Sequence, residues 1–217
     1  PLEEEQIQLF FSDIEPLAAS KVLVRIENET LSIGQRILSQ GLQLTVRGQD
    51  KIGIIGPNGV GKSTLLAKLH QLLSGKREIS LGFMPQDYQE TLQLNLSPVE
   101  FLSQTGHKEE IQKIQSYLAS LNFSYPEMHH QIHSLSGGQQ GKLLLLNLVL
   151  RKPNFLLLDE PTRNFSPTSQ PEIRKLFANY SGGLVTVSHD RRFLKEVCTS
   201  IYSLTEHGLE VVDLQDI

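Results

Sequence analysis

The sequence has too few cysteines for the disulfides that stabilise a small secreted domain, and no apolar run long enough to anchor a chain in a membrane. Its 217 residues include no tryptophan and one cysteine, Cys198. A single cysteine excludes an intrachain disulfide and a cysteine cluster for zinc, and it agrees with a reducing compartment such as the cytoplasm. We expect Cys198 to be a buried helix residue. The longest apolar run, residues 143–150, is interrupted by Asn147 and is too short to cross a bilayer.

The chain also lacks a strong net charge. Its formal charge of −4 provides no overall attraction to nucleic acid or anionic lipid, so a polyanionic partner would have to bind a local patch. The length and the hydrophobic content of 39% fit one large, soluble α/β domain. The first 20 residues are polar and acidic, begin at Pro1 without a methionine and have no signal-peptide layout. We therefore expect a piece of a longer protein.

Antiparallel strands are predicted near both ends of the chain. Residues 21–44 alternate apolar and polar side chains, and residues 200–213 do so around Gly208, so each segment predicts a hairpin. The segment KIGIIG, residues 51–56, predicts a strand that ends in a glycine-rich turn. Leucines at helical spacing follow it and predict a helix over residues 63–73. The order strand, loop, helix is therefore expected here.

The middle of the chain, about residues 90–150, is predicted to be helical. Ser97 followed by Glu100 has the pattern of a capping box, in which each side chain accepts a hydrogen bond from the other residue's backbone N–H. Ser136 and Gln139 repeat this pattern and predict the start of another helix. We expect a small α-helical subdomain in this region.

Two apolar runs later in the chain predict central strands. NFLLLDEP at residues 154–161 and GLVTVSHD at residues 183–190 are too apolar to be half exposed, which is typical of parallel strands covered on both faces. Between them, Ser169 and Glu172 are predicted to cap a helix that continues through Tyr180. Strands that alternate with helices favour an α/β fold with a mainly parallel sheet.

The glycine-rich turn after the strand at residues 51–56 has the sequence GPNGVGKST and fits the phosphate-loop pattern. Its glycines let the backbone curl so that amides face phosphate oxygens, the lysine adds positive charge and the serine reaches Mg²⁺. The alternative is a chance glycine turn, which the flanking strand and helix disfavour. The predicted nucleotide-binding residues are Gly56, Pro57, Asn58, Gly59, Val60, Gly61, Lys62, Ser63 and Thr64.

Two carboxylates follow the first apolar run, at the expected carboxyl edge of the sheet. Asp159 is predicted to hold Mg²⁺, and Glu160 to orient or deprotonate the attacking water. The alternative is a plain strand ending, which the upstream phosphate loop makes the weaker interpretation.

Together with the segment LSGGQ, these motifs resemble the ATP-binding cassette (ABC) superfamily, and their order covers residues 21–214. The resemblance implies an ATPase with a P-loop NTPase fold: an antiparallel β subdomain, a mainly parallel central sheet and a small α-helical subdomain. It implies that Gln86 senses Mg²⁺ and water, and that His189 contacts the γ-phosphate. It also implies that the signature completes the ATP site of a second, head-to-tail cassette through Ser136, Gly137, Gly138 and Gln139.

The segment SHDRRFL, residues 188–194, resembles class F of this superfamily (ABC-F). Members of that class have two cassettes in one chain and no membrane domain, and many act on ribosomes as translation factors or antibiotic-resistance proteins. By this resemblance residues 1–20 end an inter-cassette linker, and residues 21–217 form the second cassette. The implied partners are another cassette, in the same full-length chain or in a second copy, and the ribosome with its rRNA and tRNA, but not DNA.

Two alternatives stay open at this point. The chain is expected either to be class F or to be the ATP-hydrolysing subunit of a membrane transporter, the one case in which a membrane partner is expected. A nucleotide-gated binding module with little hydrolysis is the other alternative, suggested by Ser166, which replaces the aspartate usual in class F.

Two further positions differ from the class F pattern. Lys142 replaces a usual arginine. Residues 21–38 contain no aromatic ring to stack on a base, so the preference for ATP over GTP is inferred from the family alone.

Two smaller groups of residues carry weaker hypotheses. His129, His130 and His133 have a spacing that can bring two imidazoles to one helix face, but no nearby cysteine or acidic cluster completes a metal site, so a solvated loop is the favoured interpretation. The basic residues at 191, 192 and 195 could contact RNA, although short runs of this kind are usually solvated.

Overall fold

The computed structural model describes residue 11 and residues 14–217, and it contains two sheets. One is the antiparallel pair β1 (Val22–Ile33) and β2 (Arg36–Arg47). The other has six strands in the order β4-β5-β6-β3-β7-β8. Its strands are β3 (Lys51–Ile55), β4 (Leu81–Met84), β5 (Phe155–Asp159), β6 (Gly183–Val187), β7 (Ser200–Thr205) and β8 (Gly208–Val212). The predicted combination of an antiparallel pair and a mainly parallel sheet is confirmed.

The centre of the large sheet is parallel and buried. Strand β3 pairs in parallel with β6 and β7, while β5 pairs in parallel with β4 and β6. Every residue of β5 and β6 is buried, which explains their nearly continuous apolar sequences. Strand β8 is the exception, because it returns antiparallel to β7 through a tight turn in which Gly208 has φ +99°. The predicted hairpin is therefore confirmed.

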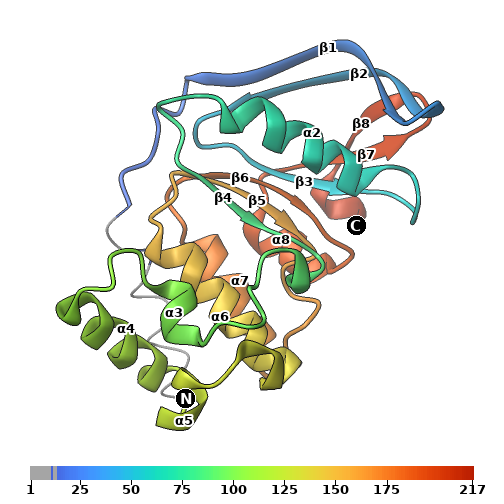
Figure 1. The fold of residues 1–217 in the computed structure, drawn as a ribbon. Helices are drawn as coiled ribbons and strands as arrows, with labels where there is room; N and C mark the ends of the chain where they lie inside the picture. The colour runs from blue at the N-terminus through green and yellow to red at the C-terminus, as the bar shows by residue number, and fades with distance from the viewer. Residues whose placement is uncertain (1–10, 12–13) are drawn as a thin grey trace.

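Helix α2 (Lys62–Ser74) lies between the β1–β2 hairpin and the central sheet (Figure 1). It buries a stripe of leucines that pack with the inner faces of both sheets in one apolar cluster. This arrangement holds the N-terminus of α2 at the carboxyl end of β3. The buried leucines of the stripe are Leu65, Leu66, Leu69 and Leu73.

The other side of the sheet carries the remaining helices, and a helical subdomain extends from it (Figure 1). The helices of this part are α3 (Pro98–Leu102), α4 (Lys108–Ser120), α5 (Tyr125–His129) and α6 (Gly137–Leu150). Both predicted capping boxes are present, Ser97 with Glu100 and Ser136 with Gln139. The short helices η2 (Tyr88–Glu90) and η3 (Ile132–Ser134) lie in the same region, and η4 (Leu214–Asp216) lies near the C-terminus.

The helix predicted after Ser169 is confirmed, but the side-chain cap predicted at this residue does not form. Helix α7 (Gln170–Ala178) begins after Ser169, but this residue already has helical angles, φ −88° and ψ −23°, and its side chain makes no cap hydrogen bond. A serine caps a helix from an extended conformation, and here its hydroxyl instead accepts a hydrogen bond from Ser166 at 3.1 Å. The helix also ends before Tyr180, which is buried and donates a hydrogen bond to the Pro153 carbonyl.

Part of the expected linker, residues 1–20, lies outside the described residues. Phe11, which is described, is buried against the rings of Phe177 and Tyr180, with centroids 6.2 and 5.1 Å away. Residue 11 thus contributes to the core of the domain. No helix in the described part of the chain is long and apolar enough to cross a membrane.

Cys198 is buried as expected, although it lies just after helix α8 (Arg191–Val197) rather than within it. Burial raises the pKa of its thiol to about 12. Because the thiolate is the reactive form, we expect Cys198 in the folded protein to react with Ellman's reagent at least about 100-fold more slowly than in denaturant. The control is the same chain unfolded at the same pH. Equal rates before and after unfolding would show that the thiol is accessible.

Candidate active site

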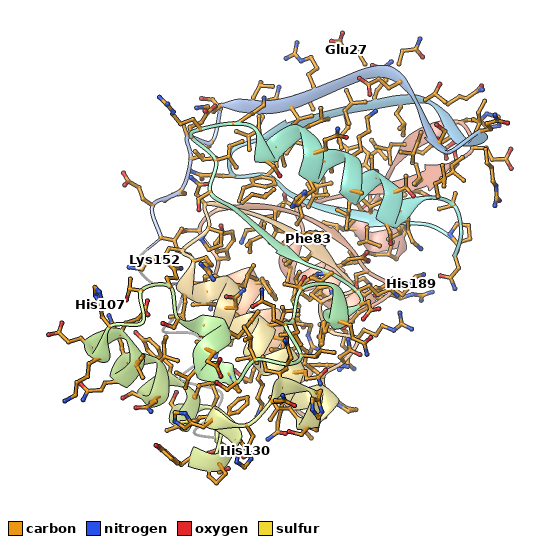
Figure 2. All side chains as sticks on the ribbon, viewed as in Figure 1. Glu27, Phe83, His107, His130, Lys152 and His189 are labelled. Atoms are coloured by element: carbon orange, nitrogen blue, oxygen red, sulfur yellow. The ribbon has the colours of Figure 1, made fainter. Side chains whose placement is uncertain are left out.

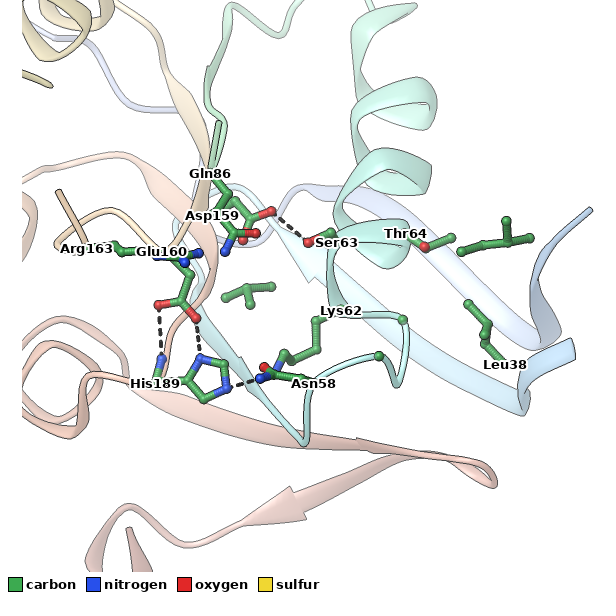
Figure 3. Close-up of a pocket in the computed structure, with 14 residues that line it drawn as sticks. Leu38, Asn58, Lys62, Ser63, Thr64, Gln86, Asp159, Glu160, Arg163 and His189 are labelled. Atoms are coloured by element: carbon green, nitrogen blue, oxygen red, sulfur yellow. Dashed lines mark hydrogen bonds and ion pairs between the residues drawn. The ribbon is translucent and has the colours of Figure 1, made fainter. Parts of the chain in front are cut away.

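A cleft of about 700 Å³ opens at the carboxyl ends of β3, β5 and β6, where the loop before α2 also lies (Figure 3). The carboxyl edge of a parallel sheet is the usual place for a ligand, because the strand ends and helix N-termini converge there. The cleft is lined by Ile33, Leu38, Asn58, Gly59, Gly61, Lys62, Ser63, Thr64, Gln86, Asp159, Glu160, Arg163, Val187 and His189.

The glycine-rich loop adopts a backbone that requires glycine. Gly61 has φ +110° at the N-terminus of α2, and a Cβ there would lie 3.0 and 3.1 Å from the side chains of Leu38 and Leu31. Gly59 is also left-handed, with φ +82°. These turns bring the loop and the first residues of α2 to the cleft, where free amides favour an anion. Of the predicted loop residues, Gly56, Pro57 and Val60 belong to the loop but do not line the cleft.

The Lys62 side chain is buried and lies over the loop. Its ammonium donates hydrogen bonds to the carbonyls of Gly56 and Pro57 and lies 3.1 Å from Nε2 of His189. Burial lowers the pKa of Lys62, and the nearby carboxylates of Glu160 and Asp159 oppose that shift. The amine is therefore held where it can bind a phosphate oxygen with little movement.

Asp159 and Ser63 form a pair that fits a divalent cation. The Ser63 hydroxyl donates a hydrogen bond to Oδ2 of Asp159 at 2.9 Å. Oδ1 of Asp159 is buried and has no hydrogen-bond partner among the described residues. Burial raises the pKa of Asp159, which the hydrogen bond from Ser63 opposes. A buried carboxylate oxygen beside a hydroxyl is a suitable pair of ligands for Mg²⁺, and Gln86 lines the same cleft.

Glu160 and His189 orient each other. Glu160 has φ +51°, a strained angle for this residue, and the strain is held by its N–H, which donates to the Val187 carbonyl at 2.8 Å. Its carboxylate accepts a hydrogen bond from the His189 backbone at 3.2 Å and another from Nδ1 of the imidazole. Because Lys62 can only donate, Nε2 of His189 accepts from it and the proton of the neutral ring lies on Nδ1. Lys62, His189 and Glu160 thus form one hydrogen-bonded chain (Figure 3).

The signature segment is not part of this cleft. Ser136 caps α6, and Gly137 and Gly138 are exposed with no heavy atom within 4 Å of a Cβ built at either position. The Gln139 side chain accepts from the Ser136 N–H and donates to Glu127. None of these residues lines the cleft. The structure therefore brings the phosphate loop, Gln86, both carboxylates and His189 together, and leaves the signature apart from them.

Sequence reasoning missed four residues of the cleft: Ile33, Leu38, Arg163 and Val187, the last residue of β6. Ile33 and Leu38 come from the β1–β2 hairpin, where no aromatic residue is available, and they make an aliphatic wall. The alternation of apolar and polar residues predicts that Ile33 and Leu38 lie in strands. It does not predict that they line the cleft, because that depends on how the β1–β2 hairpin packs. Arg163 lies three residues after Glu160, and this proximity was the only signal that could have found it.

The histidine cluster forms no metal site in the described part of the chain. His129 ends helix α5 and its Nε2 lies 3.1 Å from the Gln115 amide, while His133 contacts Gln131 at 2.6 Å. The expected solvated loop is incorrect in part, because His129 and His133 belong to short helices, whereas His130 lies between them; all three are exposed. Figure 2 shows His130 at the outer end of the helical subdomain, far from His189.

The fold and the site together define a P-loop ATPase domain. A glycine-rich loop joins the central strand β3 to a helix, and a buried aspartate followed by a glutamate lies at the end of β5, two strands away in the sheet. The chain belongs to the ABC transporter family, whose domain model matches residues 39–163.

Similar proteins support the resemblance to class F. The chain is 31% identical over 210 residues to the probable ATP-binding protein YheS of Escherichia coli, and the match covers 94% of this chain and 33% of that protein. It is 31% identical to the putative ATP-binding protein YdiF of Bacillus subtilis, covering 97% of this chain and 34% of that protein. It is 25% identical to ABC transporter F family member 2 of Arabidopsis thaliana, covering 96% and 32%. The chain thus spans about a third of these relatives.

Solved structures confirm the fold. A dimer of the ATP-binding cassette MJ0796 with ADP and phosphate superposes with a TM-score of 0.72 at 20% identity, over 88% of this chain and 98% of that one. A bacterial Atm1-family exporter with ATP bound gives 0.73 at 18% identity, over 94% and 41%. The expected ABC-type fold is therefore present.

Proposed function

We propose that this chain is the ATP-hydrolysing cassette of a class F protein, and that its site is completed by the signature of a second cassette. The observation that carries the proposal is the separation of two anion-binding ends within one domain. The loop before α2 lines a cleft with both carboxylates, whereas the exposed N-terminus of α6 does not line that cleft. An exposed helix N-terminus with two bare glycines is suited to a phosphate held by another molecule.

Six side chains of the cleft have a role in the proposed reaction. Lys62 and the loop amides bind the phosphates, and Ser63, Asp159 and Gln86 would hold Mg²⁺, which neutralises phosphate charge when bound. Glu160 accepts a proton from the attacking water, whose oxygen bonds to the γ-phosphorus as the bond to the bridging oxygen breaks. The electron pair of the broken bond stays on the β-phosphate, so the products are ADP and inorganic phosphate. His189, held by Glu160, lies at the γ-phosphate end beside Lys62.

A mixing experiment tests whether the signature acts on a second copy. Ser136→Arg places a bulky cation at the signature, and Lys62→Ala removes the phosphate-loop amine, so each variant alone should lose hydrolysis. In a head-to-tail pair of the two variants, the intact phosphate loop of the Ser136→Arg chain faces the intact signature of the Lys62→Ala chain. Equal amounts should therefore recover about a quarter of the parent activity, because half of the pairs are mixed and each has one good site.

The mixing experiment also has outcomes that would contradict the proposal. If the signature served the loop of its own chain, both variants would be defective in every site, and no mixture would recover phosphate release. Parent-level hydrolysis by the Ser136→Arg chain alone would also contradict the proposal. Gln131→Arg, an exposed position five residues before the signature serine, is the control for an added arginine on this surface.

For the full-length protein we propose a cytoplasmic, ribosome-associated role, as a translation or antibiotic-resistance factor that contacts rRNA or tRNA. The support is the class F resemblance and the relatives that share it. Sedimentation of the full-length Glu160→Gln protein through a sucrose cushion, with ATP and with ADP, tests this role. Comigration with ribosomes in ATP alone supports it. Copurification with a membrane domain in place of ribosomes would favour the transporter alternative.

A nucleotide-gated module with little hydrolysis is the second candidate function, and Ser166 favours it. The Ser166 hydroxyl, at the position where class F usually has aspartate, bonds to Thr168 and Ser169 at 3.0 and 3.1 Å. A serine lacks the charge that an aspartate would present to a facing cassette, and its hydroxyl is already engaged in these local bonds. Phosphate release by the full-length protein distinguishes the two functions, since the module would bind ATP and release almost no phosphate.

A further inference from the structure

Arg163 is a cleft residue that the proposed reaction does not yet use. It follows Glu160 in the turn after β5, and its N–H donates to the Glu160 carbonyl at 3.1 Å. Its exposed side chain lines the nucleotide cleft, and Figure 3 shows it on the same side of the cleft as Glu160 and Gln86. The backbone that strains Glu160 into place therefore also sets the position of Arg163.

Arg163 also lines a second hollow of about 690 Å³ that adjoins the cleft. The two hollows share Ser63, Gln86, Asp159 and Arg163, so these four side chains form the boundary between them. Three of the four are the proposed metal ligands Ser63, Gln86 and Asp159. The guanidinium therefore lies at the end of the cleft where the metal and the terminal phosphate are expected, not at the aliphatic end near Leu38.

The other charged groups of the cleft are already engaged. Lys62 is bonded to loop carbonyls and to His189, Asp159 accepts from Ser63, and Glu160 accepts from His189. The Arg163 side chain has no hydrogen bond or ion pair with any described residue, although two carboxylates line the same cleft. Its charge nevertheless reaches Asp159: burial raises the pKa of Asp159, and Arg163 is among the groups that oppose this rise.

A free guanidinium in this position is suited to a phosphate. Its planar fork donates two parallel hydrogen bonds to phosphate oxygens, which a lysine cannot reproduce. Arginines that reach a γ-phosphate stabilise the charge of the transition state in other phosphoryl-transfer sites.

We propose that Arg163 binds the γ-phosphate oxygens in cis and stabilises the charge that builds on them during hydrolysis. This inference rests on the proposed ATP hydrolysis. Water still forms the new bond to the γ-phosphorus and gives its proton to Glu160, and ADP leaves with the electron pair of the broken bond. Arg163 neither gives nor takes a proton, because it donates N–H groups to the three γ-oxygens while the bond to ADP breaks. Its effect is therefore on the rate, with little effect on ATP binding.

The test compares Arg163→Ala, Arg163→Lys and the control Arg77→Ala, an exposed arginine beyond the far end of α2. In the full-length protein Arg163→Ala should lower kcat about 100-fold and change the KM for ATP by less than about threefold. Arg163→Lys should recover part of that loss, because it restores the charge but not the fork. Arg77→Ala should match the parent. If Arg163→Ala unfolds more readily than the parent, Arg163→Gln replaces it.

The outcomes separate this inference from the function on which it rests. If the parent releases no phosphate, the proposed ATPase function fails and the role of Arg163 fails with it. If the parent hydrolyses ATP and Arg163→Ala has the same kcat, only the role of Arg163 is overturned. A rise in KM with unchanged kcat also overturns it, because the arginine would then bind ATP and its transition state equally. Circular dichroism during thermal unfolding checks that every variant is folded.

Discussion

Replacing Glu160 with glutamine should nearly abolish ATP turnover while ATP stays bound. The amide keeps the size of the side chain and can still accept the N–H of His189, now bonded at 3.2 Å, but it cannot accept a proton from water. General bases contribute about 10²–10⁴-fold to rates, so we expect kcat to fall by at least about 100-fold. A site that binds ATP without cleaving it should also keep two cassettes together, since the γ-phosphate is the group that both would bind.

Phosphate release and size-exclusion chromatography in ATP measure these two effects. The Glu160→Gln chain should elute as a larger species with ATP, and as the smaller species with ADP or without nucleotide. Glu210→Gln, an exposed residue of β8, is the matched control and should behave as the parent does. Parent-level turnover in the Glu160→Gln chain would show that another group accepts the proton, and the assignment of Glu160 would then be wrong.

The second large effect is expected from Lys62→Ala. Lys62 is buried and is the one side-chain cation contributed by the glycine-rich loop, so no neighbouring group of that loop can replace its charge. Hydrogen bonds to charged groups contribute about 1.5–3 kcal/mol each, and the change also leaves the Gly56 and Pro57 carbonyls without this donor. We therefore expect the affinity for ATP to fall about 100-fold or more, and hydrolysis to be lost.

Titration with a fluorescent ATP analogue, with and without Mg²⁺, measures the loss. Lys68→Ala is the control on the same helix, because Lys68 is paired with Glu29 at 2.5 Å outside the cleft. It should bind nucleotide as the parent does, since a partly exposed ion pair contributes little to stability. Unchanged affinity in the Lys62→Ala chain, with normal thermal unfolding, would contradict the role of the loop as the phosphate site.

Features that depend on a few neighbouring residues were predicted correctly from the sequence. The phosphate loop between a strand and a helix, the central strands and two capping boxes are all present, because each depends on backbone preferences or hydrogen bonds within a few positions. The error at Ser169 has the same kind of cause. Its hydroxyl had a second partner close by, Ser166, and a residue pattern alone does not show which of two local hydrogen bonds forms.

The composition of the site was only partly predictable. Asp159, Glu160 and His189 lie at strand ends, and the parallel sheet brings those ends to one edge. The hydrogen-bonded chain from Lys62 through His189 to Glu160 joins three segments that are far apart in sequence. No periodicity or spacing encodes such distances, because they depend on the order β5-β6-β3 within the sheet.

By itself the sequence determined the class of chemistry in this protein, since a glycine loop with lysine and serine binds phosphates through local geometry. Only the tertiary structure decided which side chains share the cleft and which do not. Packing of the β1–β2 hairpin placed Leu38 beside the loop, and the strained turn at Glu160 placed Arg163 near the metal ligands. The residues at the start of the signature helix α6 do not line the cleft. The set of side chains that share the cleft depends on contacts between distant segments, which form only when the chain has buried its core.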